Sequence, residues 1–197
     1  MDLLQSQLSG NIIDQLSNQI GEDKEKTETA TSGIVSMLTS ALAKNAQTPA
    51  GASSLASALD NDHDGGIFDN VSDLINGNLN NNRAANGAGI LKHVLGGKQG
   101  NAIDLISKMS GLSSSKTGSL MTMLAPMVLG MLGKEKRQQN LDQSGLSDML
   151  SRTVKSPTNQ RQEMGFIGKL LDQDGDGSVM DDLAGMGMKA LGNMFRR

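Results

Sequence analysis

Apolar residues recur along the chain at the spacing of α-helices. One stripe in the first half is made of Ile34, Val35, Met37, Leu38, Ala41 and Leu42. A similar stripe in the second half is made of Leu124, Met127, Val128, Met131 and Leu132. This spacing places apolar side chains on one face of a helix, and no segment alternates with the period of two that marks a strand. The pattern predicts an all-α, multihelical fold.

Ser, Thr, Pro and Gly residues predict where these helices begin and end. The segments EKTET (25–29) and SSSKT (113–117) precede the two stripes and contain the Ser and Thr residues that often cap helix N-termini. Pro126 falls inside the second stripe, where its missing N–H predicts a bend or the true start of that helix. The 24 glycines lie mostly between periodic segments, which predicts short helices closed by glycine. We expect Gly111 to end a helix and Leu112 to pack beneath it.

The chain matches itself when it is shifted by 90 positions. Residues 10–44 then align with residues 100–134 without a gap, and 11 of these 35 pairs are identical, including Gly21/Gly111 and Lys26/Lys116. Chance would give only two or three identities, and the matched residues are chemically diverse. An internal repeat is therefore the better interpretation.

A second self-match extends the repeat to two aspartate-rich segments. DNDHDGGIFD at 60–69 corresponds to DQDGDGSVMD at 172–181, an offset of 112, so the second copy contains about 22 additional residues between the blocks. The Asn-rich, turn-forming segment NGNLNNNRAANG separates the copies. The sequence thus predicts two related helical repeats, residues 1–80 and 81–197, with short Gly/Asn-rich connections.

Each predicted repeat carries an acidic loop of the calcium-binding type. Carboxylates stand at loop positions 1, 3 and 5, as Asp60, Asp62 and Asp64 in loop one and as Asp172, Asp174 and Asp176 in loop two. Alternate carboxylates on a tight turn can converge on one hard cation. The glycine that such a turn needs at position 6 is present in both loops, as Gly65 and Gly177.

Both loops lack the bidentate glutamate that EF-hand loops carry at position 12. Val71 and Leu183 stand there, whereas position 10 is acidic in both copies and loop two has a further acid at position 11; these acids are Asp69, Asp181 and Asp182. They could complete a smaller coordination sphere or favour the next helix through its dipole. We expect weak Ca²⁺ binding, with a dissociation constant of roughly 10⁻⁴ to 10⁻³ M. The alternative is an acidic helix cap without an ion, and His63 could add a ligand in loop one.

Composition and charge narrow the class of protein further. The net charge of −3 argues against general nucleic-acid binding, which needs clustered Lys and Arg. The absence of Cys excludes disulfides and thiolate metal sites. With three Phe, no Trp and no Tyr, the core must come from aliphatic residues and the 13 Met. The N-terminal residues lack a secretory signal and no segment is apolar enough to span a membrane, so we expect a cytoplasmic protein.

Several segments of the second half together resemble a known family. These are ILKHVLGG at 90–97, SGL at 110–112, LAPMVLGMLG at 124–133 and DQDGDGSVMDDL at 172–183. They are similar to the YidB-like family of bacterial domains of unknown function, most closely over residues 88–194. The resemblance implies an all-helical bacterial protein and supplies no catalytic residues.

We expect a non-enzymatic helical interaction or scaffolding module with calcium-type loops, which binds a protein partner or self-associates. The alternative is nucleic-acid binding, because residues 102–124 have the outline of a helix-turn-helix. Its second helix offers only Lys116 as a charge, so binding to nucleic acid is the weaker hypothesis. No catalytic residues are expected, because the sequence has no nucleophile elbow and no phosphate-binding loop after a strand. His93 lies in an apolar segment, where a structural role is expected.

Overall fold

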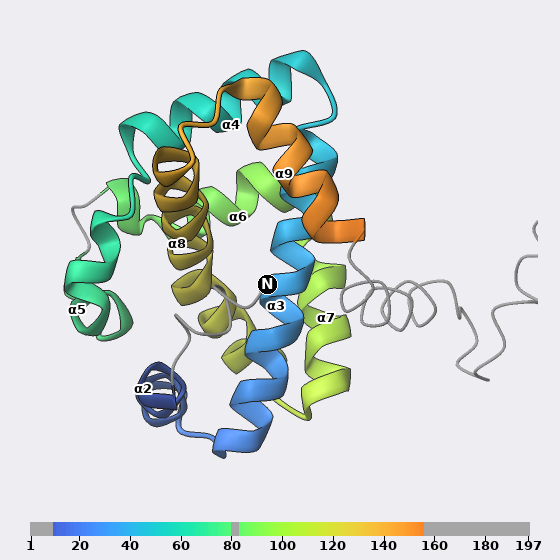
Figure 1. Cartoon of the computed structure of the whole chain (residues 1–197). Helices are drawn as coiled ribbons and strands as arrows, with labels where there is room; N and C mark the ends of the chain where they lie inside the picture. The colour runs from blue at the N-terminus through green and yellow to red at the C-terminus, as the bar shows by residue number, and fades with distance from the viewer. Residues whose placement is uncertain (1–9, 80–82, 156–197) are drawn as a thin grey trace, which may run out of the picture.

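The fold is helical throughout the part of the chain that the structure describes. The structure is a computed structural model, and it describes residues 10–79 and 83–155 (Figure 1). Its α-helices are α2 (Gly10–Ile20), α3 (Lys24–Asn45), α4 (Pro49–Asn61), α5 (Val71–Ile75), α6 (Gly87–Leu95), α7 (Gln99–Ser110), α8 (Ser114–Gln138) and α9 (Gln143–Lys155). Short 3₁₀ helices are η1 (Gly66–Asn70), η2 (Arg83–Ala85) and η3 (Gly96–Lys98). These ranges contain no strand, which confirms the all-α prediction for the described residues.

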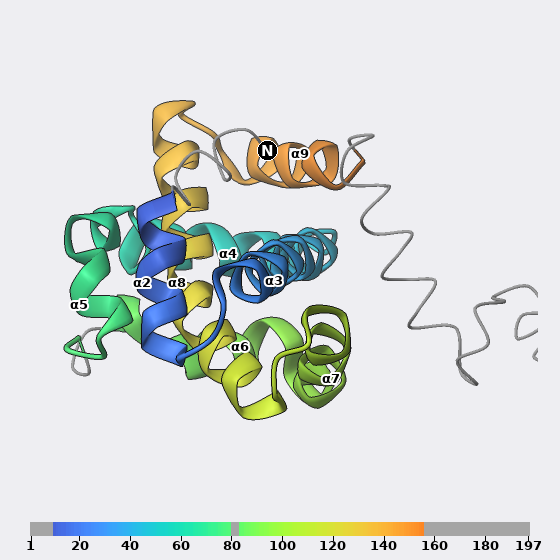
Figure 2. The ribbon, with the colours of Figure 1, turned by 90° about the horizontal axis from the view of Figure 1, so that it is seen from below.

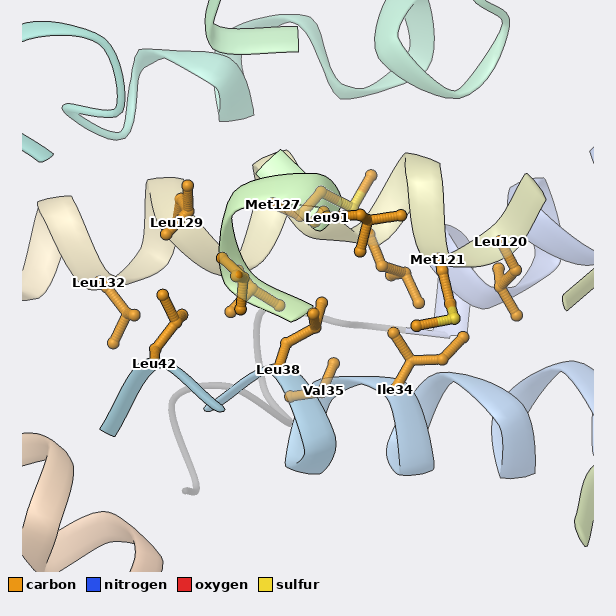
Figure 3. Close-up of a cluster of buried hydrophobic side chains, with 14 of the residues drawn as sticks. Ile34, Val35, Leu38, Leu42, Leu91, Leu120, Met121, Met127, Leu129 and Leu132 are labelled. Atoms are coloured by element: carbon orange, nitrogen blue, oxygen red, sulfur yellow. The ribbon is translucent and has the colours of Figure 1, made fainter. Parts of the chain in front are cut away.

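The two apolar stripes meet at the centre of the molecule. Helices α3 and α8 pack against each other, and Figure 3 shows buried side chains of α3, including Ile34 and Leu42, facing those of α8. Ile34, Leu38 and Leu42 are at most 3% exposed. The remaining helices surround this pair, so the core is built on the residues that the periodicity singled out.

Helix α8 is buried on all sides along its middle. Every residue from 124 to 133 is buried, because α3, α4, α6, α7 and η1 all pack against this helix. Pro126 lies inside the continuous helix and does not mark its start. Proline cannot donate the hydrogen bond that would reach Thr122 O. That carbonyl lies against Gly87 at the start of α6, where a Cβ would come within 1.8 Å of the oxygen.

The helix ends agree with the sequence at some positions and not at others. Ser113 caps α8 as predicted, with its Oγ accepting a hydrogen bond of 3.3 Å from Lys116 N. Gly111 ends α7 with a left-handed φ of 73°, and Leu112 beneath it is 4% exposed, as expected. The caps expected within 25–29 are wrong, because α3 already begins at Lys24 after Asp23. The N-cap residue Asp23 makes no capping hydrogen bond with its side chain, and Thr27 lies inside the first turn, where its Oγ1 donates to Asp23 O.

Both halves of the chain contribute to one hydrophobic core. Within each half the shorter helix packs on the longer one, α2 on α3 and α7 on α8. Across the halves, α3 contacts α7 and α9, while α8 contacts α2 and α4. Figure 2 shows α2 and α5 side by side, with α8 between them and α3. The boundary between residues 80 and 81 stays a prediction, and the described residues on its two sides share one core.

Among the helices of the described ranges, none is long and apolar enough to cross a membrane.

Candidate functional site

Loop one, residues 60–69, connects α4 to η1 through a sharp turn. Asp62 forms the C-cap of α4, and Gly65 has a left-handed φ of 96°. Asp64 Oδ1 accepts a hydrogen bond of 2.9 Å from Gly66 N, which holds the turn closed. Glycine adopts positive φ without the steric penalty of a Cβ. Gly65 therefore provides the chain reversal that the sequence predicted.

This turn lies directly on two glycines of α8. A Cβ at Gly133 would be 1.8 Å from the backbone oxygen of His63, and a Cβ at Gly130 would be 2.6 Å from Ile67 Cγ2. Ile67 is itself 6% exposed. The close approach of backbone to helix is possible only because both positions lack a side chain, so loop one is fixed to α8 by packing.

The aspartates of loop one pair with cations of α8. Asp60 Oδ1 lies 2.6 Å from Lys136 Nζ, and Asp64 Oδ2 lies 2.7 Å from Arg137 Nη2. Asp69 is exposed in the first turn of η1, so its carboxylate faces water. Two of the predicted ligands are thus each bound to a different positive side chain.

The carboxylates of loop one do not gather around one point in the described structure. Calcium takes six to eight oxygen ligands around one point. No group of three or more His, Asp or Glu side chains in residues 10–79 and 83–155 is placed to hold one metal ion. The predicted ligands Asp60, Asp62, Asp64 and Asp69 share a segment of chain without converging.

The side chain of His63 lies inside the molecule. It is 7% exposed, and its Nδ1 has no hydrogen-bond partner among the described residues. Burial lowers the pKa of this imidazole below its ordinary value of 6.5, and the nearby charge of Asp62 opposes the effect. The side chain is therefore held neutral near pH 7, and its role in the described structure is packing.

Loop two lies outside the described residues. Its predicted ligands are Asp172, Asp174, Asp176, Asp181 and Asp182, all beyond residue 155.

A groove opens along the first half of α8, between that helix and α2, with α5 along its edge. Its volume is about 680 Å³, which is within the ~300–1,000 Å³ typical of ligand sites. Residues of both halves line it, from the end of α2 and α5 on one side to the start of α7 and the first half of α8 on the other. We call it the α2/α8 groove.

The lining of the α2/α8 groove is partly apolar and partly polar. Its aliphatic lining consists of half-buried Met123 and of Ile20, Leu74 and Ile75, which are at most 8% exposed. Gln19, Gln99, Ser119 and Lys116 provide hydrogen-bonding groups. Binding sites commonly combine such an apolar surface with a few polar groups that orient the ligand.

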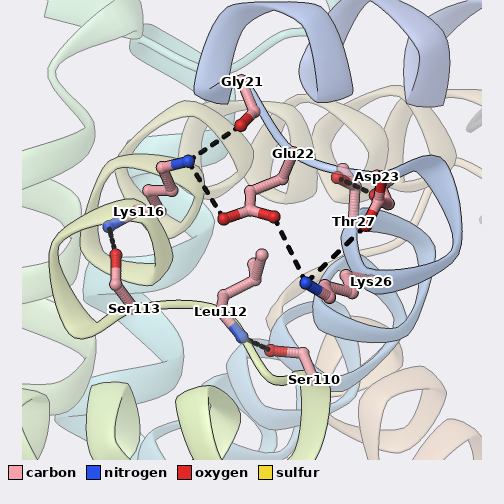
Figure 4. A network of polar contacts seen from close by, with 9 residues as sticks. All are labelled: Gly21, Glu22, Asp23, Lys26, Thr27, Ser110, Leu112, Ser113 and Lys116. Carbon is pink, nitrogen blue, oxygen red and sulfur yellow. Dashed lines mark hydrogen bonds and ion pairs between the residues drawn. The ribbon is translucent and has the colours of Figure 1, made fainter.

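Lys116 connects the groove to the opposite half of the chain. Its Nζ donates to Gly21 O at 2.8 Å and to Glu22 Oε1 at 3.0 Å (Figure 4). The other oxygen of Glu22 faces Lys26 Nζ at 3.5 Å. The hydrogen bond from Lys116 lowers the pKa of the Glu22 carboxyl, with further lowering by the charge of Lys26. Glu22 thus stays ionised between the two lysines.

The sequence did not point to this groove. Its residues come from α2, α5, η2, α7 and α8, so no local motif marks them. The one signal in the sequence was the identity of Lys26 and Lys116 in the self-alignment. The structure places Lys116 at the groove, with Lys26 on the far side of Glu22 (Figure 4).

The predicted helix-turn-helix corresponds to α7, Gly111 and the first part of α8. Leu120, Met121 and Leu124 of the second helix are fully buried against the core. His93, on α6, is exposed. The inward side chains of this part of α8 thus belong to the core.

Comparison with known families gives one match. The model of a family described as bacterial protein of unknown function (DUF937) matches residues 2–135, which is 134 of the 197 residues. The chain belongs to this family. No curated protein and no solved structure matches the chain. The narrower resemblance to the YidB-like family stays a prediction.

The DUF937 match covers the α2/α8 groove completely. All of its lining residues, from Gln19 to Met123, fall inside the matched range, whereas α9 and residues 172–182 fall outside it. Loop one lies inside the range, although its cationic partners Lys136 and Arg137 follow directly after it. The groove is therefore a feature of the DUF937 part of the chain.

Proposed function

We propose that this protein is a non-enzymatic interaction module that binds a segment of a protein partner in the α2/α8 groove. The observation that carries the proposal is the groove itself, about 680 Å³ in volume and lined by both halves of the chain. Because residues from α2, α5 and α8 must be held together to form it, the packed bundle acts as the scaffold of the site. The aliphatic surface supplies binding area, and the amides and Lys116 supply orientation.

We also infer that the scaffold arose by duplication of one helical unit. The pair α2–α3 and the pair α7–α8 are each joined at a glycine with positive φ, 64° at Gly21 and 73° at Gly111. The longer helix of each pair lies in the centre of the core. These equivalent elements support the self-alignment at an offset of 90. In this duplication the helical unit packs against its own copy. That packing is expected whether the ancestral single unit bound another protein or associated with itself.

Peptide selection tests the proposed function. A random peptide library displayed on phage is selected on the full-length protein, and the selected peptides are measured against two variants. Ser119→Trp fills the groove, whereas Ser115→Trp places the same bulk on an exposed position of α8 that does not line it. We expect Ser119→Trp to weaken binding at least tenfold and Ser115→Trp to leave it unchanged. Failure to select any peptide, or equal binding to both variants, would refute the proposal.

Calcium binding is a separate proposal and is confined to loop two. Its support is the sequence of residues 172–182, and loop one supplies a control because two of its aspartates are already paired with cations. We expect the double substitution of Asp172 and Asp174 by Asn to abolish the heat of calcium binding. The matched double substitution of Asp60 and Asp62 is expected to leave it unchanged. The reverse result in calorimetry would contradict this assignment.

A further inference from the structure

The α2/α8 groove exists because the two halves of the chain pack unequally. Helix α7 packs closely along α3, whereas its counterpart α2 packs less closely on α8. Helix α5 packs against α2 and lines the groove through Leu74 and Ile75. The groove therefore lies where one half departs from the arrangement of the other, and no segment of residues 10–79 and 83–155 fills it.

The one ionisable side chain that the described residues contribute to the lining of the groove is a lysine, which is paired with Glu22. Lys116 is the only charged side chain that lines it, and no Asp or Glu of the described residues does so. An ammonium group has three N–H donors, and two acceptors of this chain, Gly21 O and Glu22 Oε1, are bonded to it. One donor remains for an acceptor on a ligand. Gln19, Gln99 and Ser119 add further donors nearby.

The aliphatic part of the lining lies next to this cation. Ile20, at the end of α2, immediately precedes Gly21, whose carbonyl holds Lys116. Met123 lies seven residues, about two turns, further along the same helix as Lys116. When a ligand places a carboxylate at Lys116, the ligand's neighbouring side chains thus reach the apolar surface of the groove. A methionine in such a surface adapts to side chains of different shape.

We infer that the groove recognises an acidic, aliphatic peptide segment, with a carboxylate at Lys116 and aliphatic side chains against Met123 and Ile75. The inference rests on the proposed function and specifies the partner of the same site. A carboxylate accepts the remaining donor of Lys116, whereas a cation in the segment would face the ammonium group beside an acid, Glu22, whose two oxygens already meet Lys116 and Lys26. Hydrogen bonds to charged groups are the strong ones.

Three peptides with one aliphatic frame test the inference on the full-length protein. They have the form acetyl-Leu-Leu-X-Leu-Leu-amide with a fluorescent label, where X is Glu, Gln or Lys, and binding is followed by fluorescence anisotropy. We expect the Glu peptide to bind about tenfold more tightly than the Lys peptide, the factor that corresponds to ~1.4 kcal/mol. Lys116→Met should remove this preference, and Lys108→Met, an exposed position on α7, should preserve it.

A conservative variant separates charge recognition from a change of structure. Lys116→Arg keeps the positive charge and should keep the preference for Glu, with unchanged helix content by circular dichroism. If both variants lose the preference, Lys116 acts through the structure and the inference is wrong. Equal binding of the three peptides, or no binding at millimolar concentration, also overturns it. Octanoate that competes with the Glu peptide at equal affinity would indicate a small-molecule site and would likewise overturn it.

The proposed function and this inference fail in different ways. If peptides bind without a preference for Glu and still bind more weakly to Ser119→Trp, the groove is a binding site, and only its specificity for acidic segments is refuted. Absence of any groove-dependent peptide, in the library selection as well as in this series, would remove the proposed function itself.

Discussion

A methyl group added at Gly133 would collide with the backbone of loop one. The Cβ of Gly133→Ala would lie 1.8 Å from His63 O, about 1.5 Å closer than a normal carbon–oxygen contact of ~3.3 Å. The atom in the way is a backbone carbonyl at a buried residue, so it cannot rotate aside as the end of a side chain would. Either loop one or α8 has to move, and the ion pairs of Asp60 and Asp64 with α8 move with it.

The magnitude follows from comparison with a second glycine of the same helix. Gly118 is also inside α8, but its Cβ would lie 3.5 Å from Ile103 Cδ1, an ordinary contact. Alanine is more favourable than glycine in a helix by about 1 kcal/mol at both positions. Only Gly133→Ala adds the cost of overpacking, about 1–3 kcal/mol. The free energies of unfolding of the two variants should therefore differ by roughly 1–3 kcal/mol, with Gly118→Ala the more stable.

Urea denaturation followed by far-UV circular dichroism measures this difference, because the chain has no Trp or Tyr to serve as a fluorescent reporter. The two variants should differ in the midpoint of unfolding and agree in the slope with urea. Equal midpoints would show that loop one does not lie on Gly133 and would refute the account of its anchoring. A changed slope would instead indicate a change in the compactness of one variant.

Two further predictions concern buried polar groups. His63 has a pKa below its ordinary 6.5 in the folded protein, so the unfolded chain takes up the proton first as the pH falls below 6.5, and stability is lost. The decline in unfolding free energy from pH 7 to pH 5 should be smaller in His63→Gln than in the wild type, and equal declines would contradict the assignment. Thr31 is 2% exposed and its Oγ1 has no partner among the described residues, whereas Thr27 Oγ1 donates to Asp23 O at 2.9 Å. Urea unfolding should show Thr31→Val to be neutral or stabilising and Thr27→Val to cost about 1 kcal/mol; the opposite order would be inconsistent with this structure.

The helical fold was predictable because local apolar spacing and capping act within a few residues. The stripe of α3 is confirmed, with Ile34, Leu38 and Leu42 buried and Met37 half-buried as its edge. The second stripe named only part of the buried residues of α8, because neighbouring elements cover this helix on every side along residues 124–133. Apolar periodicity cannot show how many neighbours a helix has. Pro126 lies inside α8, and the Thr122 carbonyl, to which it cannot donate, lies against Gly87 of α6.

The environment of loop one could not be derived from its own sequence. The spacing of Asp60, Asp62 and Asp64 is that of a calcium loop, and the turn at Gly65 is present. The groups that meet the carboxylates, however, come from Lys136 and Arg137, more than 70 positions away. A motif specifies which ligands are available, whereas the fold decides which positive charge each of them meets.

Equivalent positions of the two halves explain why a groove forms on one side of the molecule. Gly21 and Gly111 both have a positive φ, but the residue that follows is Glu22 in one half and Leu112 in the other. Leu112 is buried in the core, whereas Glu22 remains near the surface between two lysines. An acid at position 22 draws Lys116 to the end of α2, at the border of the groove; a leucine at position 112 offers no such partner. If the groove binds a partner, Glu22, which differs from Leu112 at the corresponding position, holds in place the lysine that lines the groove.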